Sequence, residues 1–348
     1  MSDRVNIGVI GAGWWATLSH IPALIANPHV EIVAINRPDR EGLDKVARKF
    51  GLTHAYLDAA DMLARETLSG VVVASPHVLH AEHARLALDH GLHVLIEKPM
   101  ATTTEDAHDL VDLARYKGVE IIMPYGWNYK PMTDAAHRLI KEGWVGDVRH
   151  IVAQMASALA DLFSGEPMLE TRDHMFRPPP STWADPKRSG GYGWGQLTHG
   201  LGALFRLVDL DPVRVFASTG LSPAGVDFYD AAVVEFANGA TMALSGAATV
   251  PKGRGFQLDI RIFGTEGMLL FDVERARVEA IRHDGKTHVE DLPAGAGDYE
   301  AVAPITRLVE ICRGNAVVNP ADGLIGMRAT ALLDAMYRSA ASGHMVEV

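Results

Sequence analysis

Cysteine is nearly absent from this chain, whose 348 residues include only Cys312. A single cysteine excludes an internal disulfide and any zinc or iron–sulfur site that needs several thiolates. It also suits a reducing compartment, so we expect a cytoplasmic protein.

Basic residues and long apolar runs are scarce as well. The chain has 32 Lys and Arg against 43 Asp and Glu, a net charge of −11, which disfavours binding to nucleic acid. No apolar run is long enough to cross a bilayer. Residues 1–4 lead directly into an apolar segment, without the apolar core of a signal peptide. We therefore expect neither nucleic acid nor a membrane as a partner.

The first 124 residues alternate between apolar strands and helices. The length of the chain favours two domains, and 48% hydrophobic residues are enough for sizeable cores. The expected strands are 5–10, 31–35, 71–74, 94–96 and 120–123, and the expected helices include 81–89 and 104–116. This alternation predicts an α/β Rossmann domain at 1–124, a doubly wound parallel sheet.

From residue 125 on, strands follow one another without helices between them. After a helix at 131–142, the expected strands are 148–156, 213–218, 231–236, 240–247, 257–263 and 268–272, and helices are expected at 301–312 and 323–342. Asn238-Gly239 is typical of a hairpin turn. The pattern predicts a substrate-binding and oligomerisation α+β domain at 125–348 with a large, open, mainly antiparallel sheet. An open sheet needs its second face covered, so we expect a homodimer or homotetramer formed through it.

The strongest motif is Gly11-Ala12-Gly13-Trp14-Trp15-Ala16, directly after the apolar strand 5–10. This G-x-G-x-x-A pattern between a strand and a helix is the dinucleotide-binding fingerprint. Gly11 permits the tight turn, Gly13 lets a pyrophosphate approach the backbone, and Ala16 lets the helix pack closely on the strand. The helix N-terminus then offers N–H groups to the phosphates. The motif predicts a nicotinamide or flavin dinucleotide.

The end of the second strand indicates which nucleotide is used. NAD sites usually place an acidic residue there for the ribose 2′-hydroxyl, whereas this chain has Asn36-Arg37. An arginine can pair with a 2′-phosphate. We expect NADP, with NAD as the alternative because Asp39 could reach the ribose and Arg37 could be a solvated loop residue.

Polar residues follow two further strands of the first domain. Glu97-Lys98-Pro99 and Ser75-Pro76-His77 lie at the carboxyl edge, where open α/β sheets bind ligands. A buried lysine beside the nicotinamide can act on a substrate hydroxyl. The alternative is a surface salt bridge between Lys98 and its neighbours.

Three histidines recur at every third position: His77, His80 and His83. A catalytic zinc site usually adds a carboxylate or cysteine in a dry pocket, and histidines on the surface of a helix explain the spacing more simply. We interpret the three as surface residues of a helix and expect no metal.

A glycine-rich stretch at 189–200 is the main feature of the second half. Its five glycines let the backbone pass close to a ligand. Gln196 and His199 share one face if a helix begins here. His199 can relay a proton near neutral pH, or it can be a structural core histidine.

Taken in order, these motifs resemble those of the Gfo/Idh/MocA family, the glucose-fructose oxidoreductase and inositol dehydrogenase relatives. The similarity also includes Tyr125-Gly126-Trp127-Asn128-Tyr129, Trp183-Ala184-Asp185-Pro186 and Gly264-Thr265-Glu266-Gly267, and it spans nearly the whole chain. It implies an NAD(P)-dependent enzyme that interconverts a secondary alcohol and a ketone on a sugar, cyclitol or sugar derivative.

The resemblance also assigns residues to roles. It makes Lys98 and His199 the catalytic acid/base groups. The expected cofactor-binding residues are Gly11, Gly13, Trp14, Trp15, Ala16, Asn36, Arg37, Ser75, Pro76, His77, His80, Glu97, Lys98 and Asn128. The expected substrate-binding residues are Lys98, Tyr125, Trp127, Arg177, Trp183, Gln196 and His199, and the loop 169–187 is expected to shape the substrate pocket.

One position departs from the family pattern. Relatives often carry Asp four residues before the histidine, where this chain has Gly195. Gln196 cannot replace an ionisable group, and we interpret it as a contact to a substrate hydroxyl. Two alternatives stay open: a glycosidase or isomerase that retains NAD(H) and acts through a keto-sugar, and a non-catalytic dinucleotide sensor.

Overall fold

The computed structural model describes residues 4–348 and divides into two compact units. The first contains the chain up to Pro124, together with 167–182 and 301–327. The second contains 125–166, 183–300 and 328–348. The division into domains after residue 124 stays a prediction, and the structure groups two later segments with the first unit.

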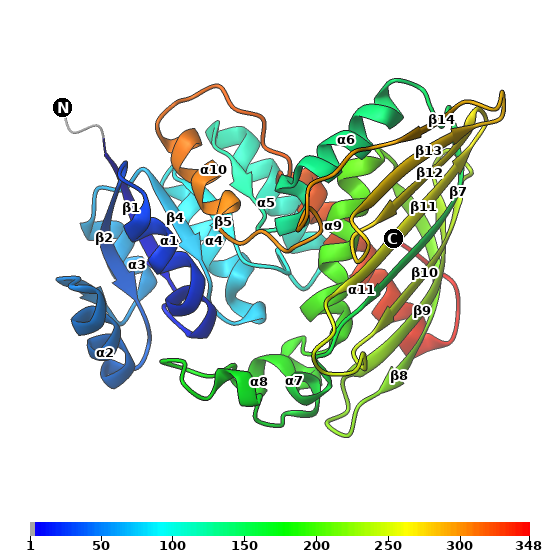
Figure 1. Cartoon of the computed structure of the whole chain (residues 1–348). Coiled ribbons are helices and arrows are strands. Elements are labelled where there is room, and N and C mark those ends of the chain that lie inside the picture. The colour runs from blue at the N-terminus through cyan, green and yellow to red at the C-terminus, as the bar shows by residue number, and fades with distance from the viewer. Residues whose placement is uncertain (1–3) are drawn as a thin grey trace. The chain divides into compact units, whose positions relative to one another are not determined.

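The first unit is built on a six-stranded, all-parallel sheet (Figure 1). The strand order is β3 (His54–Tyr56), β2 (Val30–Asn36), β1 (Val5–Ile10), β4 (Gly70–Val73), β5 (His93–Ile96) and β6 (Ile121–Ile122). All four residues of β4 are buried, as expected for a central strand covered on both faces. The order reverses between β1 and β4, which defines the topological switch point where such sheets bind ligands.

Helices connect these strands and cover the parallel sheet. They are α1 (Ile21–Ala26), α2 (Arg40–Phe50), α3 (Ala59–Arg65), α4 (His80–Asp89), α5 (Thr104–Lys117) and α10 (Ala303–Cys312). Their ends follow ordinary capping chemistry: Asp39 caps α2, Thr103 caps α5, and Gly118 ends α5 in the left-handed region.

Helix α10 packs against β4 and β5, although it lies more than 200 residues later in the chain. Gly70 permits this approach, because a Cβ there would lie 2.6 Å from Cys312 Sγ. Burial raises the pKa of the Cys312 thiol to about 12. The cysteine is therefore a packing residue and not a nucleophile.

The second unit is built on a nine-stranded, mainly antiparallel sheet. The order is β14 (Thr287–Val289), β13 (Arg277–Arg282), β12 (Gly267–Asp272), β11 (Gln257–Gly264), β7 (Val148–Ala156), β10 (Thr241–Ala247), β9 (Asp227–Phe236), β8 (Pro212–Leu221) and β15 (Val346–Glu347). Only β7 and β10 pair in parallel. The predicted fold class, a parallel Rossmann sheet plus a mainly antiparallel sheet, is confirmed.

One face of this sheet carries helices and the other face is open. The helices of the unit are α6 (Pro131–Lys141), α7 (Ala160–Ser164), α9 (Thr198–Leu207) and most of α11 (Gly323–Ser342), and α8 (Pro180–Trp183) spans the boundary between the units. α6 packs against β12 and β13, and α9 packs against β7 (Figure 1). Strands β8 and β9 alternate between buried and exposed residues, as expected for a sheet covered on one side.

The hairpin predicted at Asn238-Gly239 is confirmed. It joins β9 to β10, with Gly239 in the left-handed region at φ +83°. Four short strands escaped the sequence analysis: β3, β13, β14 and β15. Each has six residues or fewer and lies at or next to a sheet edge, so its hydrophobic pattern is weak. No helix between residues 4 and 348 has the length and apolar character needed to cross a membrane.

Candidate active site

The turn after β1 has the backbone that a dinucleotide site requires. Gly11 lies at φ +81°, and a Cβ there would come within 2.4 Å of the Ser75 main-chain N. At Gly13 the nearest atom to a Cβ would be 3.8 Å away, so space for a phosphate remains beside the backbone. A helix begins at Trp14 and includes a π-helical turn at 16–20, where Ala16 is buried. Such turns are rare and often mark functional sites.

The side chain of Arg37, directly after β2, is held in place by neighbouring groups. Its Nη1 donates to Ala12 O at 3.1 Å, and its Nε pairs with Asp39. The absence of a side chain at Gly42 makes space for the Arg37 guanidinium, because a Cβ there would lie 2.3 Å from Arg37 Nε. Asn36 is buried and donates through Nδ2 to Tyr56 O, while its carbonyl accepts from Gly11 and Ala12. The arginine side chain is therefore ordered beside the glycine turn.

His80 ties the ends of β4 and β5 together. Its Nδ1 lies 2.7 Å from Pro99 O and its Nε2 lies 2.7 Å from Ser75 O. Burial lowers the pKa of His80, although the two carbonyls and the Glu97 charge oppose that shift. Ser75 Oγ lies 2.9 Å from His83 Nδ1. His80 thereby fixes the spacing of two loops that sequence analysis assigned to the cofactor site.

Lys98 is buried at the carboxyl end of β5, with 9% of its surface exposed. Burial lowers the pKa of Lys98 to about 8, against the opposing charge of Glu97. Glu97 in turn lies 2.7 Å from His20 Nε2. Burial raises the pKa of Glu97, but the His20 hydrogen bond and nearby positive charges outweigh it and hold that pKa below its usual value. This is a buried lysine close to its titration point, not the exposed surface salt bridge that the sequence left open.

The interpretation of His77 and His80 as surface residues is wrong, because their exposed fractions are 3% and 1%. Residues at the start of a helix become buried when loops from elsewhere in the chain cover them. The spacing of the histidines in the sequence does not reveal such a cover. Between residues 4 and 348, no group of three or more His, Cys, Asp or Glu side chains could hold a metal ion.

The glycine-rich stretch forms a buried π-helical turn, Gly193–Leu197, which continues directly into α9. Gln196 and His199 are 8% and 6% exposed. At Gly195 a Cβ would lie 2.7 Å from Phe163 Cε1 and 3.2 Å from Trp183 Cζ3. Two aromatic rings therefore fill the space that an aspartate side chain would need, which explains the departure at Gly195.

His199 lies among three aromatic rings of the second unit. Its ring makes edge contacts with Tyr125, Trp127 and Tyr299, at centroid distances of 5.9, 6.1 and 5.2 Å. The Tyr299 hydroxyl lies 3.4 Å from His199 Nδ1. This arrangement orients the imidazole through aromatic packing and a phenol instead of a carboxylate.

The neighbouring aromatic residues are themselves held firmly. Tyr125 bonds to Thr198 Oγ1 at 3.0 Å, and Trp127 Nε1 donates to Gly297 O. Asn128 is fully buried and donates to Gly202 O on α9. Tyr125 and Trp127 are thus fixed beside His199, and Asn128 anchors the same segment to α9.

Behind the glycine-rich turn lies a pair of buried carboxylates, Asp227 and Asp230 on β9. Asp227 accepts from Gly193 N–H at 2.7 Å and from the Tyr337 hydroxyl at 2.8 Å. Burial and the Asp227 charge raise the pKa of Asp230 well above its usual value. Asp230 Oδ2 is buried and has no hydrogen-bond partner among the described residues. The pair supports the turn from below.

The loop 169–187 is divided between the two units. Its residues up to Thr182 belong to the first unit, where His174, Met175 and Phe176 contact Trp14, Lys45 and Arg37 respectively. Arg177 is exposed. Trp183 belongs to the second unit, with its ring 6.3 Å from that of Phe163.

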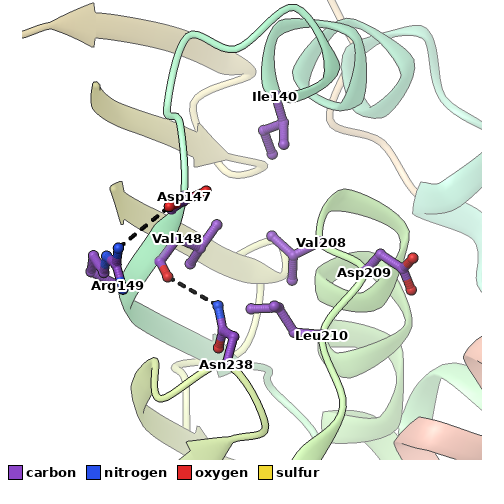
Figure 2. Close-up of a pocket in the computed structure, with 8 residues that line it drawn as sticks. All are labelled: Ile140, Asp147, Val148, Arg149, Val208, Asp209, Leu210 and Asn238. Carbon is purple, nitrogen blue, oxygen red and sulfur yellow. Dashed lines mark hydrogen bonds and ion pairs between the residues drawn. The ribbon is translucent and has the colours of Figure 1, made fainter. Parts of the chain in front are cut away.

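A separate pocket of about 370 Å³ lies in the second unit between the start of β7 and the segment after α9 (Figure 2). It is lined by Ile140, Asp147, Val148, Arg149, Val208, Asp209, Leu210 and Asn238. Arg149 pairs with Asp147, and Asn238 donates to Val148 O. None of the predicted site residues lines it, and its third charged residue, Asp209, pairs with Arg328 outside the pocket lining.

Sequence reasoning missed several residues of the site: His20, Phe163, Phe176, Asp227, Asp230 and Tyr299. All of them except Asp230 meet a partner across a long sequence separation, and none belongs to a motif. The one signal in the sequence is the pair Asp227 and Asp230, which lie on one strand, β9. Because their spacing is three, regular alternation would place the two side chains on opposite faces of that strand.

Two family models match this chain. The model of an oxidoreductase family with an NAD-binding Rossmann fold, Gfo/Idh/MocA, matches residues 5–125. The Gfo/Idh/MocA C-terminal domain model matches residues 133–270.

Individual relatives match nearly the whole chain at low sequence identity. D-xylose 1-dehydrogenase (NADP(+)) 2 of Haloferax volcanii is 27% identical over 347 residues, 98% of this chain and 99% of that protein. D-apiose dehydrogenase of Paraburkholderia graminis is 26% identical over 361 aligned positions, 99% of this chain and 90% of that protein.

Solved structures share the fold. An oxidoreductase domain protein from Kribbella flavida superposes with a TM-score of 0.78 at 21% identity, covering 100% of both chains. Levoglucosan dehydrogenase in complex with NADH superposes with a TM-score of 0.77 at 22% identity, covering 99% of both chains.

Proposed function

Since this chain belongs to the Gfo/Idh/MocA family of NAD(P)-dependent oxidoreductases, as the sequence resemblance predicted, we propose that it interconverts a secondary alcohol and a ketone on a sugar or polyol. The observation that carries the proposal is Lys98, a buried lysine with a pKa of about 8 at the ligand-binding edge of the Rossmann sheet.

The residues at the switch point fit a dinucleotide. Gly11 permits the tight turn against Ser75, Gly13 leaves room for the pyrophosphate, and the helix that begins at Trp14 supplies N–H groups at its N-terminus. Ser75, Pro76, His77 and the carboxyl end of β5 line the same sheet edge. We assign NADP because Arg37 is held beside the turn by Ala12, Asp39 and Gly42. A prepared guanidinium suits a 2′-phosphate better than a free hydroxyl.

When bound, the nicotinamide accepts or donates the hydride. In the oxidative direction, Lys98 in its neutral form takes the proton of the substrate hydroxyl. A pKa of about 8 leaves an appreciable neutral fraction at physiological pH, whereas an ordinary lysine would be almost fully charged. Glu97 tunes this value, because its negative charge favours the protonated lysine.

His199 is the second acid/base group of the proposal. Its aromatic surroundings and Tyr299 fix the ring, and Gly195 leaves no carboxylate in the preceding turn. Gln196 can bind a substrate hydroxyl but cannot transfer a proton. The two proton-transfer groups are then Lys98 and His199.

The names of several relatives support the substrate class. D-xylose and D-apiose dehydrogenases match nearly the whole chain, and both names describe enzymes of sugars. Trp127, Trp183, Tyr125 and Arg177 are the proposed substrate contacts besides Gln196. Planar aromatic side chains offer apolar faces that suit a sugar ring.

The test is a dehydrogenase screen across sugars, cyclitols and sugar acids with NAD and NADP. Reduction of NADP with a sugar or polyol supports the proposal. Cofactor that stays bound through purification without net turnover would favour the alternative of a keto-sugar glycosidase or isomerase. Binding without any chemistry would favour a sensor.

We further propose a homodimer or homotetramer formed through the open face of the nine-stranded sheet. Apolar side chains there are well exposed, with Phe216 at 43%, Tyr229 at 48% and Val233 at 50%. Such a row on a monomer favours association. Light scattering measures the assembly directly. Cytoplasmic location stays a prediction from the single cysteine.

A further inference from the structure

Three successive residues from the middle of the chain, His174, Met175 and Phe176, contact the Rossmann fold of the first unit. Trp14 Nε1 donates to His174 Nδ1 at 3.0 Å, and the two rings stack at 21°. Lys45 Nζ donates to Met175 O at 3.1 Å. The Arg37 guanidinium lies 4.0 Å above the ring of Phe176.

These contacts reach three separate elements of the Rossmann fold. Trp14 begins the helix after the glycine turn, Arg37 follows β2, and Lys45 lies on α2. The ring of Phe176 is shared by two cations, because Lys45 Nζ lies 5.3 Å from its centroid. A loop that touched this surface by chance would not meet all three elements through consecutive residues.

The contact with Phe176 completes the environment of Arg37. Asp39 holds Nε, Ala12 O accepts from Nη1, and the aromatic ring covers one face of the guanidinium plane. Nη2 has no hydrogen-bond partner among the described residues, so its N–H groups remain available to an anion. An arginine restrained in this way loses little side-chain entropy when it binds a phosphate.

We infer that the segment His174-Met175-Phe176 is part of the cofactor site, and that Phe176 is a positioning residue that makes Arg37 selective for the 2′-phosphate of NADP. This inference rests on the proposed preference for NADP. It assigns cofactor specificity partly to a residue outside the strand–turn–helix motif, in a loop that sequence analysis assigned to the substrate pocket.

The experiment measures dissociation constants of NADPH and NADH by nicotinamide fluorescence, without substrate. Phe176→Ala removes the ring, Phe176→Tyr retains it, and Tyr116→Ala removes an exposed aromatic side chain elsewhere in the first unit. Phe176 is only partly buried, so these variants are expected to fold. Thermal melting checks that they do.

Phe176→Ala should weaken NADPH binding about 3- to 10-fold, the range of one cation–π contact, and should change NADH binding less than about twofold. Phe176→Tyr and Tyr116→Ala should bind both cofactors as the wild type does. Equal losses for NADPH and NADH, or no loss for either, would overturn the inference. A wild-type protein that does not prefer NADPH would instead refute the assignment of NADP, and this is known before any variant is measured.

Discussion

Asp227 accepts a 2.7 Å hydrogen bond from the main-chain N–H of Gly193, the first residue of the π-helical turn that carries Gln196. Asp230 lies on the same face of β9 as Asp227 because a β-bulge lies between the two residues. The pairing of β8 with β9 shifts between Gly220–Tyr229 and Leu221–Asp227, which leaves Phe228 as an extra residue. Without that residue, the two carboxylates would point to opposite faces of the sheet.

The first prediction concerns the pH dependence of stability. The pKa of Asp230 is raised in the folded state, by burial and by the Asp227 charge, so the folded protein binds a proton that the unfolded chain releases above about pH 4. The free energy of unfolding must then fall as pH rises toward the folded-state pKa. Tyr192 and Tyr337 also face the pair, and burial raises the pKa of each further above its usual value, so both stay neutral throughout this range.

Asp230→Asn should reduce that pH dependence, and what remains belongs to Asp227, whose pKa is also raised by burial. We expect little change in the free energy of unfolding near pH 4, and stabilisation by about 1–3 kcal/mol at pH 8, because the amide avoids a buried charge. Urea unfolding at both pH values measures this. Glu235→Gln, on the same strand but partly exposed, is the control. If the stability of the variant depended on pH as strongly as that of the wild type, the folded protein would not hold a proton on Asp230.

The second prediction concerns Lys98. In the oxidative direction, kcat/KM should rise with pH through a limb near the lysine pKa of about 8. Lys98→Met should lower the rate roughly 10²- to 10⁴-fold while leaving cofactor affinity nearly unchanged. A loss within about threefold would refute the role, since it is far below that range.

Glu97→Gln refines this prediction. The Glu97 charge raises the pKa of Lys98, so its removal should move the limb to lower pH. Glu105→Gln removes an exposed charge on α5 and should leave the limb in place. A limb that is unmoved in Glu97→Gln, or moved to higher pH, would assign the titration to another group.

The third prediction concerns Arg37. Arg37→Asp should weaken NADP binding roughly 10- to 100-fold, the value of a charge-assisted hydrogen bond, and should favour NAD. Arg48→Asp makes the same charge change on the exposed side of α2 and should leave the preference unchanged. Fluorescence titration with both reduced cofactors measures it, and undiminished NADPH affinity in Arg37→Asp would exclude the proposed contact.

The fourth prediction separates His199 from Gln196. His199→Ala should lower kcat roughly 10²- to 10⁴-fold, because it removes one of the two acid/base groups. Gln196→Ala should mainly raise KM, because it removes binding shared by the ground and transition states. The exposed His108, as His108→Ala, is the control. A kcat of His199→Ala within about threefold of the wild type would reduce His199 to a structural role.

The fifth prediction tests why no aspartate stands at position 195. Gly195→Ala should lower the free energy of unfolding by about 1–3 kcal/mol, because its Cβ would overlap Phe163. Gly200→Ala is the matched control on the next turn, where the nearest atom would lie 3.4 Å away. That change should be neutral or stabilise the helix by up to about 1 kcal/mol. Equal melting temperatures for the two variants would show that the Phe163 ring moves aside at little cost, which would contradict the prediction.

Much of the first unit could be predicted from local sequence. The glycine turn and the position of Lys98 after β5 each depend on neighbouring residues, whose conformational preferences act within one turn or strand. The same holds for the hairpin at Asn238-Gly239 in the second unit. The short strands β3 and β13 to β15 were missed for the same reason, since they have too few residues to show a period.

What the sequence by itself determined was the order of elements and the chemistry placed at their ends: the dinucleotide turn, Arg37, Lys98 and the glycine-rich stretch with His199. Only the tertiary structure decided how these groups are tuned. It buried His80 between two loops, filled the space at Gly195 with Phe163, placed Phe176 under Arg37 and set Asp227 against Gly193. Burial and long-range contacts set pKa values and side-chain orientation, and they depend on residues that no local pattern connects.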